Sequence, residues 1–181
     1  MTEQRRGVTL IGMPGAGKST VGVLLSKRLA LDFVDSDLAI QVREGRTLQQ
    51  LIDAEGHLRL REIEAAVLLG IDPLGRVVAT GGSAVYSDEA MRHLAAGSTI
   101  VYLDVALAEL RRRITDYDTR GIARRPEQSF EELFAERTRL YRRYAGLRID
   151  CAGLGQEALL DRIVAALISR GDSAAARTAS W

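Results

Sequence analysis

A glycine-rich octapeptide is the segment whose residue types and spacing point most directly to chemistry. Residues 12–19 read Gly-Met-Pro-Gly-Ala-Gly-Lys-Ser and fit the pattern G-x-x-x-x-G-K-[ST] at every position. Glycines let backbone N–H groups turn inward around an anion, and a helix that begins near Lys18 adds the positive end of its dipole. Lys18 would reach the β- and γ-phosphates of a nucleotide, and the Ser19 hydroxyl would ligate Mg²⁺. The alternative is a tight strand-to-helix turn that binds no phosphate.

Two aspartates after the next predicted strand are candidates for the acceptor side of a phosphoryl transfer. Asp35 and Asp37 flank Ser36. A carboxylate at this place can hold the water shell of Mg²⁺, and its neighbour two residues on can face a substrate hydroxyl. The structural alternative is that Ser36 or Asp37 only caps the helix that begins at Leu38. The neighbouring phosphate loop favours the functional interpretation.

Further candidates lie in the middle and the last third of the chain. Arg61 precedes Glu64 by three residues on a predicted helix, a spacing that alone is typical of an exposed ion pair. Gly81 and Gly82 end a buried strand, where they form a turn or let the backbone approach a ligand closely. Arg124-Arg125-Pro126 falls in the least regular segment, as a closing lid would. Arginines there would neutralise charge on a transferred phosphoryl group.

Short apolar runs alternate with longer stretches of helical periodicity, and these elements must position the candidate residues. Such alternation predicts an α/β protein with a mainly parallel sheet covered on both faces. Ligands of these sheets collect at the carboxyl ends of the strands, where the glycine-rich loop, the aspartates and the glycine pair fall. The predicted strands are 8–11, 33–34, 76–80, 99–103 and 147–149, and the predicted helices are 18–30, 38–44, 48–55, 58–69, 87–95, 107–114, 130–144 and 157–168.

Composition narrows the class of protein. The chain has 181 residues, 46% of them hydrophobic, and a net charge of +1. The length and the hydrophobic fraction predict one folded domain over residues 1–171, followed by a flexible tail at 172–181. The small net charge argues against a protein that mainly binds nucleic acid or an anionic membrane. The single cysteine, Cys151, favours a reducing compartment, and no apolar run approaches the roughly 18 residues of a membrane span. We therefore expect a cytoplasmic protein and a monomer.

Taken in order, these pieces resemble the shikimate kinases over roughly residues 8–168. The resemblance implies a P-loop fold like that of the nucleoside-monophosphate kinases, with a five-stranded parallel sheet and helices on both faces. It also implies substrate-binding helices at about 36–70 and a mobile lid at about 116–129. The pieces that carry the resemblance are 12–20, 35–37, 60–64, 80–82, Arg125-Pro126, and Arg137 ahead of 140–142.

The resemblance implies transfer of the γ-phosphate of ATP, with Mg²⁺ as cofactor, to the 3-hydroxyl of shikimate. Asp37 would bind the accepting hydroxyl and act as its base, and Asp35 would hold the Mg²⁺ shell together with Ser19. Arg61 and Arg137 would clamp the substrate carboxylate, since a guanidinium fork suits that group. The backbone of Gly81 and Gly82 would face the substrate, and Lys18, Asp37 and Arg125 would be the catalytic residues. The nucleotide would be bound by Gly12, Gly15, Ala16, Gly17, Lys18, Ser19, Thr20, Arg113 against the adenine, and Arg125 from the lid.

The chain departs from the family pattern at two places. Ser83 stands where a third glycine is expected, and the lid residues 118–127 differ from those of the family. The sequence therefore leaves three alternatives to the interpretation as a shikimate kinase. They are a kinase of another carboxylated alcohol such as homoserine, a nucleotide-binding module without turnover, and a nucleoside-monophosphate kinase. The last would need a base-reading pocket, which the sequence does not identify.

Overall fold

Short runs rich in aliphatic and β-branched residues form the five strands of one parallel sheet. The computed structural model describes residues 5–114 and 121–172. Every strand pairs in parallel with its neighbours, in the order β2-β3-β1-β4-β5, so β1 lies at the centre. This confirms the predicted fold class. The strands are β1 (Gly7–Ile11), β2 (Asp32–Asp35), β3 (Arg76–Ala79), β4 (Ser98–Asp104) and β5 (Leu147–Asp150).

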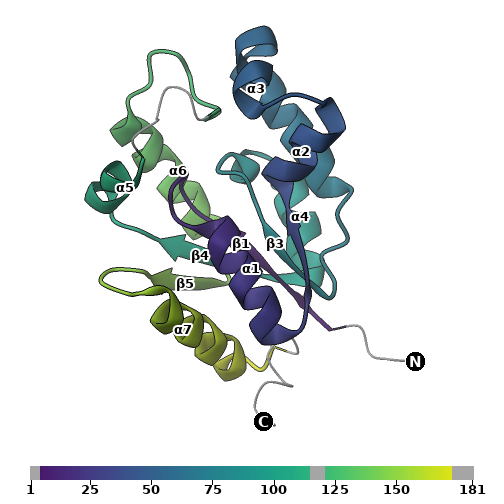
Figure 1. The fold of residues 1–181 in the computed structure, drawn as a ribbon, viewed down its shortest axis with the longest axis vertical. Helices are drawn as coiled ribbons and strands as arrows, with labels where there is room; N and C mark the ends of the chain where they lie inside the picture. Colours follow the sequence, from purple (N-terminus) through teal and green to yellow (C-terminus); the bar gives the residue numbers. More distant parts are fainter. Residues whose placement is uncertain (1–4, 115–120, 173–181) are drawn as a thin grey trace.

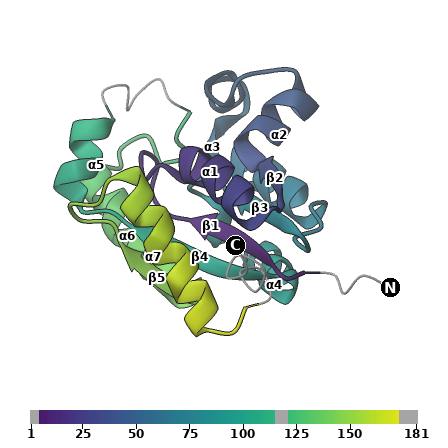
Figure 2. The same cartoon turned by 60° about the horizontal axis from the view of Figure 1, so that its bottom comes forward.

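Helices cover both faces of the sheet. Figure 1 and Figure 2 show α1 and α7 side by side on one face, with α4 and α6 on the other. The α2–α3 pair and α5 stand on opposite sides of the edge where the phosphate loop leaves β1 (Figure 1). The helices are α1 (Lys18–Leu29), α2 (Ser36–Glu44), α3 (Leu48–Leu69), the 3-10 helix η1 (Ala84–Tyr86), α4 (Asp88–Gly97), α5 (Leu107–Arg113), α6 (Phe130–Tyr144) and α7 (Gln156–Ser169).

Side-chain caps fix where the helices that carry functional residues begin. Thr47 and Gln50 form a capping box at the start of α3, and Ser129 and Glu132 form another at the start of α6. Each cap of this kind stabilises a helix by about 1 kcal/mol. Gly56 interrupts α3 with φ 85° and ψ 166°, a backbone conformation that glycine adopts readily. The predicted break at this glycine is confirmed, although the two halves run on as one kinked element.

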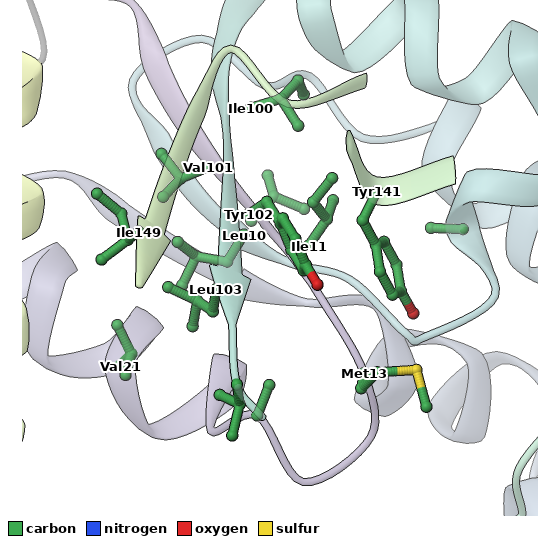
Figure 3. Packing of buried hydrophobic residues seen from close by; sticks show 14 of the residues in the cluster. Leu10, Ile11, Met13, Val21, Ile100, Val101, Tyr102, Leu103, Tyr141 and Ile149 are labelled. Atoms are coloured by element: carbon green, nitrogen blue, oxygen red, sulfur yellow. The ribbon is translucent and has the colours of Figure 1, made fainter. Parts of the chain in front are cut away.

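The main core fills both sides of the central strands. Leu10 and Val101 are fully buried there, and Cys151 belongs to the same buried cluster as a free thiol. Figure 3 shows Tyr102 of β4 next to Tyr141 of α6, and their rings stack with centroids 5.2 Å apart. Stacked aromatic pairs contribute beyond their buried area. This contact fixes α6 against the sheet.

A second, smaller apolar cluster holds Ala123 against α2 and α3. Its buried members are Ile40, Leu51, Leu60, Ile63 and Ala123. Figure 1 shows the segment 121–129 running from the side of α3 to the start of α6. Residues 116–120 of the predicted lid and residues 173–181 of the predicted tail lie outside the described part of the chain. Within the described ranges, no helix has the length and apolar character needed to cross a bilayer.

Candidate active site

The loop between β1 and α1 has the backbone of an anion-binding nest. Gly12 and Gly15 adopt φ angles of 149° and 80°, which L side chains rarely adopt. A Cβ at Gly12 would also lie 2.9 Å from the Leu103 carbonyl oxygen. The N-cap of α1 is Gly17, and neither a side-chain cap nor an acidic residue occupies the first turn. The N–H groups and the positive dipole of this helix end are therefore available to an anion.

Lys18 is held by the loop that it follows. Its Nζ donates to the carbonyl oxygens of Gly12 and Met13 at 2.7 and 2.9 Å. The side chain is buried, and burial lowers the pKa of its ammonium to about 8, an effect that the charge of Asp37 partly opposes. A buried ammonium at the start of α1 is well placed to attract phosphate oxygens.

The turn between β2 and α2 joins both aspartates to the end of β3. Asp35 is the N-cap of α2, and its Oδ1 accepts from the N–H groups of Asp37 and Leu38. A side chain of this turn therefore does cap the helix, as the structural alternative predicted, but the capping residue is Asp35 and not Ser36 or Asp37. The Ser36 hydroxyl accepts from the Gly81 N–H at 2.9 Å. This bond places the Asp37 side chain beside the glycine pair.

Gly81 and Gly82 permit a close approach that other residues would block. A Cβ at Gly81 would collide with Asp37 Oδ1 and Glu64 Oε1, and one at Gly82 would lie 2.6 Å from Arg137 Nη1. The Gly82 carbonyl oxygen accepts from the Tyr141 hydroxyl at 2.6 Å. The glycine pair is therefore more than a turn, because side chains of three helices meet at its backbone.

Arg61 of α3 and Arg137 of α6 converge on one backbone oxygen. Both donate through Nη2 to the Ala123 carbonyl, at 3.2 and 2.7 Å. The Nε atoms of both arginines are buried without a hydrogen-bond partner among the described residues. The Arg61 guanidinium also lies 3.6 Å from the centroid of the Tyr86 ring, a cation–π contact. Two guanidinium groups at one place form a strong site for a carboxylate.

Glu64 does not form the exposed ion pair with Arg61 that its spacing suggested. Its side chain is 2% exposed, and Oε2 accepts a hydrogen bond from the Ser83 hydroxyl. Burial raises the pKa of the Glu64 carboxyl to about 7, and the charge of Asp37 adds to that effect. The sequence analysis missed this residue as a member of the site.

One cavity of about 290 Å³ brings most of the predicted residues together. It joins the phosphate loop to Asp37, Glu64, the end of β3 and residues 121–123. Of the predicted residues, Gly12, Ala16, Asp35, Arg61 and Arg125 do not line it. Those that do are Gly15, Gly17, Lys18, Ser19, Thr20, Asp37, Gly81, Gly82, Arg113 and Arg137.

Arg113 and Arg125 differ in their relation to this cavity. Arg113 lines it from the end of α5, and its Nη1 donates to the Gly15 carbonyl at 3.4 Å. The Arg125 side chain is 64% exposed and lies 3.4 Å from Glu136, outside the lining. For Arg125 to reach bound phosphates, the segment around it would have to move toward the phosphate loop.

The donors near the loop suit a magnesium ion that is held mainly by nucleotide phosphates. In residues 5–114 and 121–172, no group of three His, Cys, Asp or Glu side chains could form a metal cage. The Ser19 hydroxyl lines the cavity, and Asp35 stands at the adjoining turn. Mg²⁺ prefers oxygen donors, keeps several of its waters, and relies on one or two protein ligands plus phosphate oxygens. The residues present fit that pattern.

Comparison with known proteins agrees with this arrangement. A family model described as "Shikimate kinase" matches residues 14–168. The chain is 37% identical over 161 residues to a shikimate kinase of Rhodococcus erythropolis, and the match covers 87% of this chain and 95% of the relative. A shikimate kinase of Mycobacterium avium is also 37% identical, with 87% and 91% covered.

Solved structures give the same result. A shikimate kinase from Acinetobacter baumannii in complex with shikimate is 29% identical, with a TM-score of 0.82 and coverage of 92% of this chain and 94% of that one. The shikimate kinase of Aquifex aeolicus is 30% identical, with a TM-score of 0.77 and coverage of 91% and 97%. A thymidylate kinase from Candida albicans is 14% identical, with a TM-score of 0.57 and coverage of 95% of both chains, and shares the fold.

Proposed function

The chain belongs to the shikimate kinase family, which transfers the γ-phosphate of ATP to the 3-hydroxyl of shikimate, and we propose that the cavity over the phosphate loop carries out this transfer. The observation that supports this assignment most strongly is that Arg137, which shares the Ala123 carbonyl with Arg61, lines the same cavity as Lys18 and the phosphate loop. An acid and a triphosphate can thus bind with Asp37 between them.

On the nucleotide side, residues 12–20 would bind the phosphates through backbone N–H groups, with Lys18 on the β- and γ-phosphates. Arg113 would lie against the adenine, since its side chain lines the cavity beside Gly15. Ser19 and, through water, Asp35 would hold Mg²⁺, which neutralises charge on the phosphates when bound. We also propose a mobile lid at about 116–129 that brings Arg125 onto the transferred phosphoryl group.

On the acceptor side, Arg61 and Arg137 would bind the substrate carboxylate, and the backbone of Gly81 and Gly82 would face the ring. Asp37 would accept the hydrogen bond of the 3-hydroxyl and take its proton as the oxygen attacks the γ-phosphorus. The new bond joins that oxygen to phosphorus, while the bond between the γ-phosphorus and the β–γ bridging oxygen breaks and ADP leaves. Lys18 and Arg125 would offset the charge that develops on the phosphoryl oxygens.

A single chain supplies every role in this proposal, which supports a monomer acting on small molecules. A cytoplasmic location fits the need for ATP as the phosphate donor.

Replacing Arg61 with lysine tests the carboxylate clamp. A lysine keeps the positive charge but loses the fork that donates two parallel hydrogen bonds, so we expect the KM for shikimate to rise about tenfold or more. The KM for ATP should stay near the wild-type value. Arg59→Lys is a matched control on the same helix, because Arg59 pairs with Glu55 and Glu62 on the surface. Equal shikimate KM values for the two variants in a coupled assay would contradict the clamp.

Tyr86 is expected to position Arg61 through its ring. Tyr86→Leu removes the cation–π contact, which is worth about 0.5–2 kcal/mol, so the KM for shikimate should rise about two- to thirtyfold. Tyr86→Phe keeps the ring but loses the hydroxyl that donates to Glu136 at 2.5 Å, and its effect should be smaller. If steady-state kinetics show the phenylalanine variant to be as impaired as the leucine variant, the ring is not the important feature.

Product identification tests the proposed function directly. The purified protein is incubated with ATP and Mg²⁺ together with shikimate, homoserine or another hydroxy acid, and the products are identified by mass spectrometry and phosphorus NMR. We expect ADP and shikimate 3-phosphate. Negligible turnover of shikimate alongside good turnover of homoserine would show that shikimate is not the acceptor. Nucleotide binding without any phosphorylated product would show that the protein is a binding module and not an enzyme.

A further inference from the structure

Ser83 occupies the position where the family pattern has a third glycine, and its side chain makes a specific contact. Ser83 directly precedes η1 and is 7% exposed. Its hydroxyl donates to Glu64 Oε2, a bond between residues 19 positions apart in the sequence. A glycine here would have no hydroxyl, so the contact depends on the serine. Both residues line the cavity.

The second oxygen of the same carboxylate is available to a ligand. Glu64 Oε1 is buried and has no hydrogen-bond partner among the described residues. A Cβ at Gly81 would collide with this oxygen and with Asp37 Oδ1, so the two oxygens face the same small volume above the Gly81 backbone. A buried acceptor without a partner is costly, and a hydroxyl of a bound substrate would satisfy it.

Charged groups from three other helices determine how readily Glu64 ionises. Burial and the charge of Asp37 in α2 raise the pKa of the Glu64 carboxyl, whereas Ser83, Arg137 of α6 and Lys18 of α1 act in the opposite direction. Tyr141 of α6 and Arg61, one turn earlier on α3, also face it. The pKa of about 7 makes the ionisation of Glu64 sensitive to a single hydrogen bond near neutral pH.

We propose that Ser83 is a positioning residue for the acceptor: by holding Glu64 Oε2 it directs Oε1 into the cavity, where Oε1 accepts a hydrogen bond from a hydroxyl other than the one that is phosphorylated. This inference rests on the proposed function of the cavity. Asp37 binds the reacting hydroxyl and Glu64 binds a second one. The site therefore favours a polyhydroxylated acid over an acid with one hydroxyl, such as homoserine.

The test measures the affinity for shikimate over a range of pH in two variants without the hydroxyl, Ser83→Ala and Ser83→Gly. Calorimetric titration gives the Kd independently of turnover. We expect both variants to bind shikimate about three- to tenfold more weakly near neutral pH, because Glu64 loses the hydrogen bond that fixes it and favours its charge. The wild-type Kd should rise as the pH falls through about 7, and this rise should begin at a higher pH in both variants.

Three results would overturn the proposal. One is an unchanged Kd and an unchanged pH dependence in both folded variants. Another is a weaker Kd in Ser83→Gly alone, which would trace the effect to backbone freedom instead of the hydroxyl. A change in melting temperature without a change in the pH dependence would likewise leave Ser83 a structural residue only. Because the Kd needs no catalysis, absence of phosphorylated product in the wild type would contradict the proposed function and not this inference.

Discussion

Replacing Lys18 with alanine is expected to lower kcat by about 10²–10³-fold, the usual effect of removing one preorganised donor to a developing charge. The Lys18 ammonium stands in the wall of the cavity, where the Gly12 and Met13 carbonyls hold it in place before any nucleotide binds. Its position is therefore fixed in advance, and little reorganisation is needed when charge develops on the phosphoryl oxygens.

The same substitution should leave the fold intact. Burial lowers the pKa of Lys18 to about 8 in the folded protein, so its charged form is less favourable there than in the unfolded chain. The charge of Lys18 therefore opposes folding at neutral pH. This destabilisation decreases as the pH rises from about 8 toward 10.5, the ordinary pKa of lysine, because the folded protein loses the charge first. Thermal unfolding at pH 7 should show a melting temperature within a few degrees of wild type.

The matched control is Lys27→Ala, which changes the other lysine of the chain at an exposed position of the same helix. This control should keep the wild-type kcat. A Lys18→Ala protein that is folded and retains kcat within a fewfold of wild type would remove Lys18 from the catalytic residues.

Asp37→Asn is expected to lower kcat by about 10²–10⁴-fold, the range that a positioned general base contributes. Asparagine keeps the size of the side chain but cannot accept the proton of the attacking hydroxyl. Nucleotide affinity should change little, because Asp37 lies beside Gly81, at the end of the cavity where we propose that the acceptor binds. A coupled assay of ADP release measures kcat, and a titration with ADP measures the nucleotide Kd.

Asp53→Asn is the control for this variant, since Asp53 is an exposed residue of α3 that accepts from Gln49. It should behave as wild type in both measurements. A decrease in kcat of less than tenfold for Asp37→Asn would mean that Asp37 only orients the acceptor and that the proton leaves by another route.

The sheet and its helices could be predicted because local signals agree with the tertiary structure. Short buried runs such as 99–103 have no helical periodicity, and the helix over 130–144 begins with a Ser129–Glu132 capping box. The phosphate loop is equally local, since one contiguous segment supplies its glycines, its lysine and its helix. The parallel sheet then brings the ends of β1, β2 and β3 to one edge.

Contacts between distant segments could not be predicted from the residues alone. Glu64 stands three residues after Arg61, a spacing equally compatible with a solvated ion pair, and only the packing of α3 against the Ser83 turn buries it. The shared oxygen of Ala123 joins α3 and α6 through a segment with no periodic signal of its own. The positive charge of Arg125 indicates attraction to phosphate but does not indicate its contact with Glu136.

The central claim is that one cavity holds a triphosphate and a carboxylated alcohol in line, and a crystal structure with shikimate, Mg²⁺ and a non-hydrolysable ATP analogue tests it most directly. We expect the triphosphate in the nest of residues 12–20, the carboxylate between Arg61 and Arg137, and the 3-hydroxyl against Asp37. Shikimate bound with its carboxylate away from both guanidinium groups, or a nucleotide bound outside the nest, would contradict the account.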